Sequence, residues 1–217
     1  MQKNRSQMSY LNFKNQFFDL KCFNIHQVYA WRADFDKSNL TRWCKRDLLV
    51  KLRNGFYSFP EYLKQPDLHY LVSNLIYRPS YISLHTALAF YGMIPEAVIT
   101  VTAVGSLKKA KFENAFGTFS YQQIAPKLMF GYDLKPIAGG QALWFAQPEK
   151  ALLDLLYLYP FYNTIQDMDE LRIDEDFMHL DFNMDRFCQY AHRFHSKALS
   201  KRTELVLKTY NLAIRNS

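Results

Sequence analysis

Apolar residues near the start of the chain recur at the spacing of an α-helix. The recurring positions are Phe13, Phe17, Phe18 and Leu20. They predict a first helix over residues 12–22. Asn24, followed three residues later by Gln27, has the spacing of a capping box, in which each side chain bonds the backbone N–H of the other residue. This pair predicts that a second helix begins there.

A third helix is predicted from Ser38, a residue type that favours the N-cap position. After it, apolar residues recur at helical spacing: Leu40, Trp43, Cys44 and Leu48. The face opposite these anchors is polar and cationic. We assign that face to DNA contact through Ser38, Asn39, Thr41, Arg42, Lys45 and Arg46. Helix-turn-helix proteins present such a face to the major groove.

Asn54-Gly55 predicts a β-hairpin with a two-residue type I′ turn, whose central residues both need a positive φ. Such a turn pairs Arg53 with Phe56, Leu52 with Tyr57, Lys51 with Ser58 and Val50 with Phe59. Cross-strand partners share a face. One side of the hairpin is therefore expected to be apolar, with Val50, Leu52, Tyr57 and Phe59, and the other to carry Lys51, Arg53 and Ser58.

Three helices followed by a basic-faced hairpin predict a winged helix, in which the hairpin is the wing. We therefore interpret residues 1–62 as a DNA-binding domain, with Lys51 and Arg53 as the contacts from the wing. The distribution of charge agrees. Residues 1–66 hold 12 Lys and Arg against 5 Asp and Glu, whereas residues 67–217 hold 15 of each. A net positive charge confined to one end favours a polyanionic partner at that end.

The remainder of the chain, residues 67–217, alternates between helical and strand patterns. Helices are predicted over residues 67–77, 84–91, 148–158, 184–195 and 199–215. Short strands are predicted over residues 98–104, 111–113, 118–124, 128–132 and 142–146, and Gly139-Gly140 fits a hairpin turn. The predicted fold is α+β: a winged helix-turn-helix followed by a larger domain of helices packed on a small antiparallel or mixed sheet.

Composition limits the class of protein. With 49% apolar and 17% aromatic residues the chain can build a substantial core. No apolar run approaches the roughly 18–20 residues of a membrane span, and the basic start lacks the apolar stretch of a signal peptide. Cys22, Cys44 and Cys188 are unevenly spaced and odd in number, which is typical of reduced thiols. We expect a cytoplasmic protein that does not associate with a membrane.

Three segments of the chain resemble a known family. The first runs from Leu40-x-x-Trp43 through Val50-Lys51-Leu52-Arg53-Asn54-Gly55-Phe56-Tyr57-x-Phe59-Pro60. The second is Tyr81-Ile82-Ser83-Leu84, continuing through Tyr91-Gly92 to Ile94-Pro95-Glu96, and the third is Pro148-Glu149-Lys150-Ala151-Leu152-Leu153-Asp154-Leu155. Together they resemble the AbiEi family of antitoxins over about residues 13–160. Asn54 departs from the family pattern, in which we expect a basic residue before the glycine.

The resemblance implies a bacterial antitoxin of a type IV toxin–antitoxin (abortive infection) pair. Such proteins are described as repressors of their own operon through the winged helix, and their C-terminal domain as counteracting a nucleotidyltransferase-type toxin, often without a stable complex. We therefore expect double-stranded operator DNA and such a toxin as partners. We expect no enzymatic step, no cofactor and no metal.

Within the third segment, Glu149, Lys150 and Asp154 are candidates for a toxin-neutralising surface. The alternative interpretation is that Glu149 simply suits the positive end of the helix dipole. Lys150 and Asp154, four residues apart, would then form an ordinary surface pair.

Two other groups of residues could carry metal chemistry. Cys188, His192 and His195 recur on one helical face and could bind zinc, although a packing face is the favoured interpretation because a fourth ligand is not evident. An acidic stretch over residues 167–185 could hold Mg²⁺, form a solvated loop or dock against the basic N-terminal end. The alternative function is accordingly a metal-dependent nuclease or nucleotidyltransferase-like enzyme that depends on Asp169 or Glu170.

Overall fold

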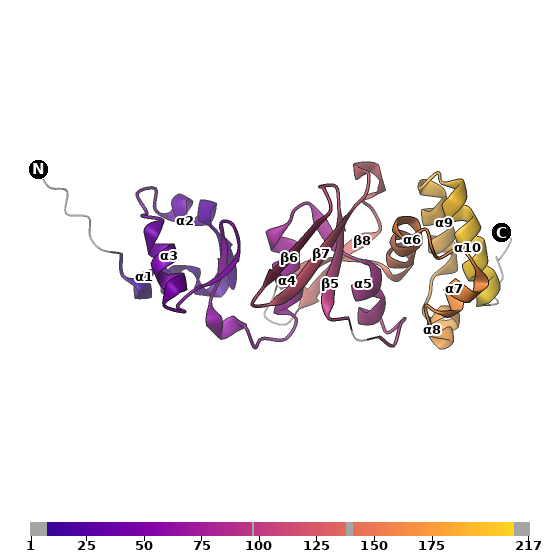
Figure 1. Cartoon of the computed structure of the whole chain (residues 1–217), viewed down its shortest axis with the longest axis horizontal. Helices are drawn as coiled ribbons and strands as arrows, with labels where there is room; N and C mark the ends of the chain where they lie inside the picture. Colours follow the sequence, from indigo (N-terminus) through magenta and orange to yellow (C-terminus); the bar gives the residue numbers. More distant parts are fainter. Residues whose placement is uncertain (1–7, 97, 138–140, 211–217) are drawn as a thin grey trace, which may run out of the picture.

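The computed structural model describes residues 8–96, 98–137 and 141–210. Figure 1 shows the chain running from an N-terminal unit at one end, through a β-sheet in the middle, to a layer of helices at the other end. The mixture of helices and sheets confirms the predicted α+β class. Among the described residues, no helix combines the length and apolar composition that a membrane crossing requires.

The N-terminal unit alternates helices with the strands of a small antiparallel sheet. Its elements are α1 (Tyr10–Phe17), a 3-10 turn (Phe18–Leu20), β1 (Cys22–Asn24), α2 (Ile25–Trp31), α3 (Ser38–Lys45), β2 (Val50–Arg53) and β3 (Phe56–Ser58). The strands lie in the order β1-β3-β2. An aromatic core holds the unit together: the Phe13 ring centroid lies 4.7 Å from those of Phe17 and Trp43.

The helix boundaries of this unit follow the predictions in part. The capping box of Asn24 and Gln27 is confirmed. The predicted first helix is too long, because Lys21 adopts a positive φ and the chain turns into β1. Ser38 is not an N-cap: it is the first residue of α3, and its backbone N–H donates to the Asp36 carboxylate.

The predicted hairpin forms, but its turn is not type I′, because Gly55 has a positive φ and Asn54 does not. The register is correct only beside the turn. Arg53 pairs with Phe56 as expected, whereas Lys51 pairs with Tyr57 and Val50 with Ser58. A bulge at Leu52 accounts for the shift, since it places one extra residue on β2. The prediction that Val50, Leu52, Tyr57 and Phe59 share one apolar side of the hairpin is therefore wrong. Val50 and Leu52 pack with the core of the larger part of the chain, and Tyr57 and Phe59 pack in the N-terminal core.

The larger part of the chain is built on a six-stranded mixed sheet, which confirms that prediction. Its strands are β4 (Ser80–Ile82), β5 (Thr100–Gly105), β6 (Ala110–Asn114), β7 (Gly117–Gln123), β8 (Tyr132–Ile137) and β9 (Gln141–Ala146). They lie in the order β6-β7-β5-β4-β9-β8. β5 is parallel to β7 and β4 to β9, and the other neighbours are antiparallel.

Helices α4 (Leu68–Ile76) and α6 (Pro148–Leu158) cover opposite faces of this sheet. The Tyr121 hydroxyl donates to the Ser73 carbonyl of α4, and the Tyr81 hydroxyl donates to Asp154 of α6. The register pairs Tyr81 with Val104 and Val104 with Gln122, so Tyr121 points away from the Tyr81 face. α5 (Leu84–Phe90) follows β4 and packs against α6 and β5.

The strand predictions for this part fail at two places. β4 has only three residues and was not predicted. The strand expected over residues 128–132 is wrong, because Pro126–Leu128 forms a 3-10 turn and β8 begins at Tyr132. The turn predicted at Gly139-Gly140 lies outside the described residues.

Four helices, α7 (Ile165–Asp169), α8 (Glu175–Leu180), α9 (Met184–Arg193) and α10 (Lys197–Thr209), close the described chain. The predicted extension of the last helix to residue 215 lies outside the described residues. The acidic stretch is not simply a solvated loop, which was one of its three expected forms, because α7, α8 and the start of α9 lie within it. Two of its carboxylates bond to the backbone at helix starts: Asp167 accepts the N–H of Thr164, and Asp174 accepts that of Phe177.

Candidate DNA interface and the buried motif network

The outer face of α3 is cationic. Leu40 and Trp43 anchor the helix in the N-terminal core, with 0% and 4% of their surface exposed. Residues on the opposite face of the helix are exposed: Ser38, Thr41, Arg42, Lys45 and Arg46. Five of the six residues that the sequence assigned to this face therefore lie on it.

Asn39 is the exception, because only 6% of its surface is exposed. It nevertheless acts on the cationic face, since the Arg42 guanidinium donates to its Oδ1. This bond restricts the rotamers of Arg42. An immobilised arginine loses less side-chain entropy when it binds a ligand. Asn39 is thus placed to orient Arg42 rather than to contact DNA itself.

An open hollow of about 500 Å³ lies along one side of α3. It is lined by Met8, Ser9, Tyr10, Arg42, Trp43, Lys45 and Arg46. Tyr10 forms part of its wall, because its hydroxyl donates to the Leu48 carbonyl at 2.8 Å and its ring packs on Trp43. Three cations around one open hollow make a site suited to a phosphate group.

Lys51 continues this cationic surface onto the hairpin. The bulge in β2 leaves Lys51 exposed and opposite Tyr57. Burial raises the pKa of the Cys44 thiol in α3, and the charge of Lys51 opposes this shift in part. Lys51 is exposed and lines a second hollow with Arg53 and Lys111, so its ammonium group is available to a ligand.

Arg53 does not face the same way. Its guanidinium donates to the Ile76 carbonyl at the end of α4 at 2.6 Å, and it lies 5.0 Å from the Tyr77 ring centroid and 4.4 Å from that of Phe112. The Asn114 amide donates to the Leu52 carbonyl nearby at 3.1 Å. The predicted wing contact therefore holds the N-terminal unit against α4 and β6.

The second and third family-like segments meet in one buried polar network. The Tyr81 and Ser83 hydroxyls donate to Asp154 Oδ2 at 2.8 Å and 2.9 Å. Lys150 Nζ donates to Tyr81 Oη at 2.9 Å and forms an ion pair with Asp154. Burial lowers the pKa of Lys150, against the opposing effect of Asp154, and raises the pKa of Tyr81 well above its ordinary value.

This burial corrects the prediction of a toxin-neutralising surface at these positions. Lys150 and Asp154 are 0% exposed and Glu149 is 1% exposed, so none of the three is available to a partner. The expected pairing of Lys150 with Asp154 does occur, but in the core and not on the surface. The hydrophobic residues around them identify the segment as a core helix, which the apolar pattern of α6 could have indicated.

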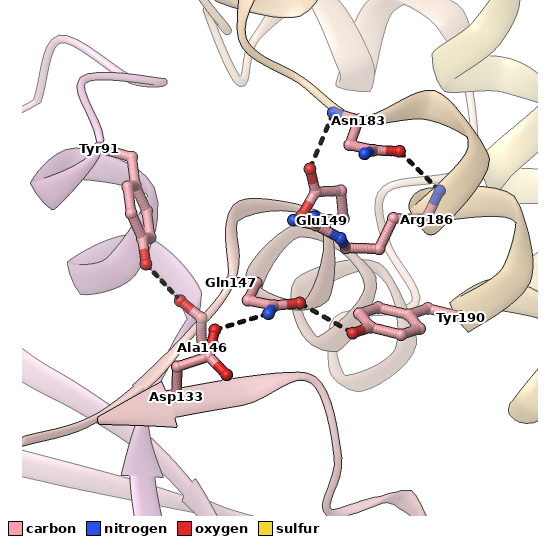
Figure 2. A network of polar contacts seen from close by, with 8 residues as sticks. All are labelled: Tyr91, Asp133, Ala146, Gln147, Glu149, Asn183, Arg186 and Tyr190. Carbon is pink, nitrogen blue, oxygen red and sulfur yellow. Dashed lines mark hydrogen bonds and ion pairs between the residues drawn. The ribbon is translucent and has the colours of Figure 1, made fainter. Parts of the chain in front are cut away.

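Glu149 ties α6 to the C-terminal helices. Figure 2 shows its carboxylate accepting the backbone N–H of Asn183 at 2.8 Å and lying 3.4 Å from the Arg186 guanidinium. The Asn183 side chain in turn accepts the Arg186 N–H at the start of α9. The same view shows Gln147 bridging Asp133 of β8 and Tyr190 of α9. The segment that resembles the family thus joins sheet, α6 and α9.

Gly131 packs against Lys150 and Tyr190, and the sequence analysis did not predict this role. It has a φ of +66°, and a Cβ there would lie 2.7 Å from Tyr190 Cε2 and 3.1 Å from Lys150 Cβ. Only glycine allows the backbone to pass this close to Lys150. No local motif marks the position, because its neighbours come from α6 and α9.

The remaining candidate groups do not assemble a metal site. Cys188 is partly buried, while His192 and His195 are exposed. Among residues 8–96, 98–137 and 141–210, no three His, Cys, Asp or Glu side chains come together in a way that could hold a metal ion. Asp169 and Glu170 lie at the end of α7, at the opposite end of the molecule from the N-terminal unit (Figure 1).

The chain matches no protein-family model, and no curated protein matches it in sequence.

Proposed function

We propose that the protein is a DNA-binding transcriptional regulator whose N-terminal unit is a winged helix. The order of its elements, with α2 and α3 joined by a short connection and a hairpin after them, supports this assignment. The observation that carries the proposal is the exposed cationic face of α3, bordered by the hollow at Tyr10 and by Lys51. In this model α3 enters the major groove and Lys51 contacts the backbone.

Individual side chains have separate roles in the proposed complex. Arg42 and Lys45 lie at the centre of the exposed face, so they are assigned to base edges. Arg46, which lines the hollow together with Ser9 and Tyr10, is assigned to a phosphate there. Arg53 is excluded from the contact set because it holds the junction with α4.

The resemblance to AbiEi proteins extends this proposal to an antitoxin that represses its own operon and counteracts a nucleotidyltransferase-type toxin. The burial of Glu149, Lys150 and Asp154 changes the form of the proposal. These residues build the domain that acts on the toxin, and other, exposed residues make its surface. We expect the protein to act in the cytoplasm.

Footprinting on the DNA upstream of the protein's own gene tests the regulator. We expect a protected inverted repeat that persists in the presence of a chelator of divalent ions. Protection that requires Mg²⁺, or cleavage of the probe, would instead favour the metal-dependent enzyme. Co-expression with the product of a neighbouring nucleotidyltransferase-type gene tests the antitoxin separately, with restored growth as the expected result.

A further inference from the structure

Strand β8 leaves one edge of the six-stranded sheet open. It is the last strand in the sheet order, with β9 as its neighbour in the described part of the chain. Beside this edge lie two exposed apolar side chains, Leu134 at 51% and Trp144 at 40%, which stand opposite each other in the register. The Trp144 ring also packs edge-on against Tyr132 at 5.5 Å. An apolar patch beside an unpaired strand is a place where another strand can add.

The backbone register identifies which groups of β8 point outward. The Gln147 N–H donates to the Gly131 carbonyl at 2.9 Å, and these two residues continue the pairing of Tyr132 with Ala146. Hydrogen-bonded pairs alternate along an antiparallel ladder. Tyr132, Leu134 and Pro136 therefore turn their backbone groups away from β9. The position of Pro136 agrees, because a proline lacks the N–H that an inward position would need.

We propose that β8 pairs antiparallel with β8 of a second copy of this chain, around a two-fold axis at Leu134. The outward-facing residues are self-complementary in this arrangement. Each Leu134 N–H donates to the Leu134 carbonyl of the other copy, and each Tyr132 N–H donates to the other Pro136 carbonyl. Because proline has no backbone N–H, the bond from Pro136 back to the facing Tyr132 carbonyl does not form.

Charge complementarity favours a second copy over an unrelated strand. In this register Asp133 of each chain stands opposite Lys135 of the other, so two ion pairs form on one face. On the other face Leu134 and Trp144 of the two chains meet and cover each other. Only the register centred on Leu134 forms both ion pairs. Sliding one β8 strand by two residues would place Asp133 or Lys135 opposite an uncharged partner.

Lysine and proline on an edge strand can also prevent it from pairing with another strand, and β8 contains both. Lys135 does not block the edge: it is half-buried, and its Nζ lies over the Tyr91 ring at 5.3 Å. In the dimer its ammonium group turns from this ring to Asp133 of the second copy. One Asp133 oxygen accepts from Gln147, which holds the carboxylate in place (Figure 2). The opposite edge strand, β6, presents Lys111 and Glu113 and lies against the N-terminal unit through Asn114. β8 is the edge with exposed apolar residues.

This dimer does not depend on the proposed function, but it has a consequence for it. Pairing about a two-fold axis relates the two N-terminal units by the same symmetry, which is the symmetry of an inverted repeat in DNA.

Sedimentation equilibrium of the full chain, with a charge exchange, tests the pairing. Asp133→Lys places like charges opposite each other twice, and we expect the dissociation constant of the dimer to rise about ten-fold or more. Lys135→Asp should act likewise. The double variant Asp133→Lys plus Lys135→Asp restores both ion pairs and should dimerise again, which a merely structural defect would not allow. Lys201→Asp, an exposed change on α10, serves as the control.

Disulfide cross-linking tests the position of the axis. In a background with Cys44→Ser and Cys188→Ser, Leu134→Cys should form a covalent dimer on oxidation, because paired residues there come within disulfide reach. Leu180→Cys, at a residue that is 80% exposed, is the control. A chain that stays monomeric at all concentrations, a double variant that fails to recover, or cross-linking no faster at 134 than at 180 would overturn the pairing.

Discussion

Lys150 and Asp154 place opposite charges in a part of the core that water does not reach. Removing an ion pair from water is costly, and the pair offsets that cost only when its remaining bonds are satisfied. Here the two hydroxyls of Tyr81 and Ser83 complete the set. The arrangement stabilises one packing of β4 on α6, because any slip of either element would leave a charge without a partner.

Removing one member of this pair should be far more damaging than removing both. Lys150→Met leaves the Asp154 charge buried, and we expect a loss of about 3–5 kcal/mol in the free energy of unfolding. The double variant Lys150→Met plus Asp154→Leu should lose less than either single variant. Chemical denaturation of the full chain measures all three. A double variant whose loss equals the sum of the two single losses would contradict this account.

Arg42 and Lys51 should differ in the kind of DNA-binding energy that they supply. Arg42→Ala should cost about 1–3 kcal/mol of binding free energy and relax sequence preference, because Arg42 is assigned to a base edge. Lys51→Ala should weaken all sequences alike and reduce the salt slope by about one, since Lys51 is assigned to a phosphate. Titrations of matched and scrambled duplexes over a salt series separate the two effects. Indistinguishable effects of the two variants would refute the assignment.

At the level of single elements, the sequence predicted those features that depend only on residues close to one another in the chain. The capping box at Asn24 and the hairpin turn at Asn54-Gly55 depend on residues within four positions, and both formed, although Asn54 lacks the positive φ that the expected type I′ turn requires. β1 and β4 were missed because each has three residues and is stabilised by a distant partner. The bulge at Leu52 was missed for a related reason: Leu52 packs into a core that the hairpin sequence does not contain.

Dependence on residues distant in the sequence also explains which candidate site residues were predicted correctly and which were not. Periodicity placed most of the α3 face correctly, since exposure on a helix follows from the residues of that helix. Arg53 and the Lys150 pair were misassigned because their neighbours Phe112 and Tyr81 come from other elements. A charged residue in an apolar segment has the same local signature whether it is exposed or paired in the core.

Arg53 should hold β2 against α4 and β6. Arg53→Ala removes its bond to the Ile76 carbonyl and its contacts with two aromatic rings. We expect trypsin to cut faster at Lys64, an exposed residue between the two cores, while the N-terminal core itself stays folded. Lys45→Ala, on the exposed face of α3, is the control. Equal cleavage of the two variants would show that Arg53 does not secure the junction.

At the scale of the whole molecule, the cationic face of α3 and the most acidic helices lie at opposite ends. The cationic face lies at the N-terminal end and the acidic helices α7 and α8 at the other end (Figure 1). A polyanion attracts the first and repels the second. The charge distribution therefore orients the molecule with the N-terminal unit toward DNA.

Folding should weaken at alkaline pH, because several acidic protons are buried. Burial raises the pKa of Cys22 from 9.0 to about 12 and that of Tyr91 from 10.0 to about 12. Above pH 9 the unfolded chain releases these protons and the folded chain keeps them, so stability falls as the pH rises toward 12. The lowered pKa of Lys150 acts in the opposite direction on its own.

Denaturation curves from neutral to alkaline pH measure this fall. Cys22→Ala removes one of the buried acids and should make the fall shallower without abolishing it. Stability that stays constant or increases above pH 9 would contradict the assigned burial.

The most direct measurement is the binding of a fluorescently labelled duplex from upstream of the gene, followed by anisotropy at low and high salt. The account predicts saturable binding at low salt that weakens as salt is added. Arg42→Ala plus Lys45→Ala should weaken it further, and Lys201→Ala, on the exposed surface of α10, should not. A chain that binds no duplex at low salt, or that loses as much affinity from the α10 change as from the α3 changes, would contradict the proposal that α3 reads DNA.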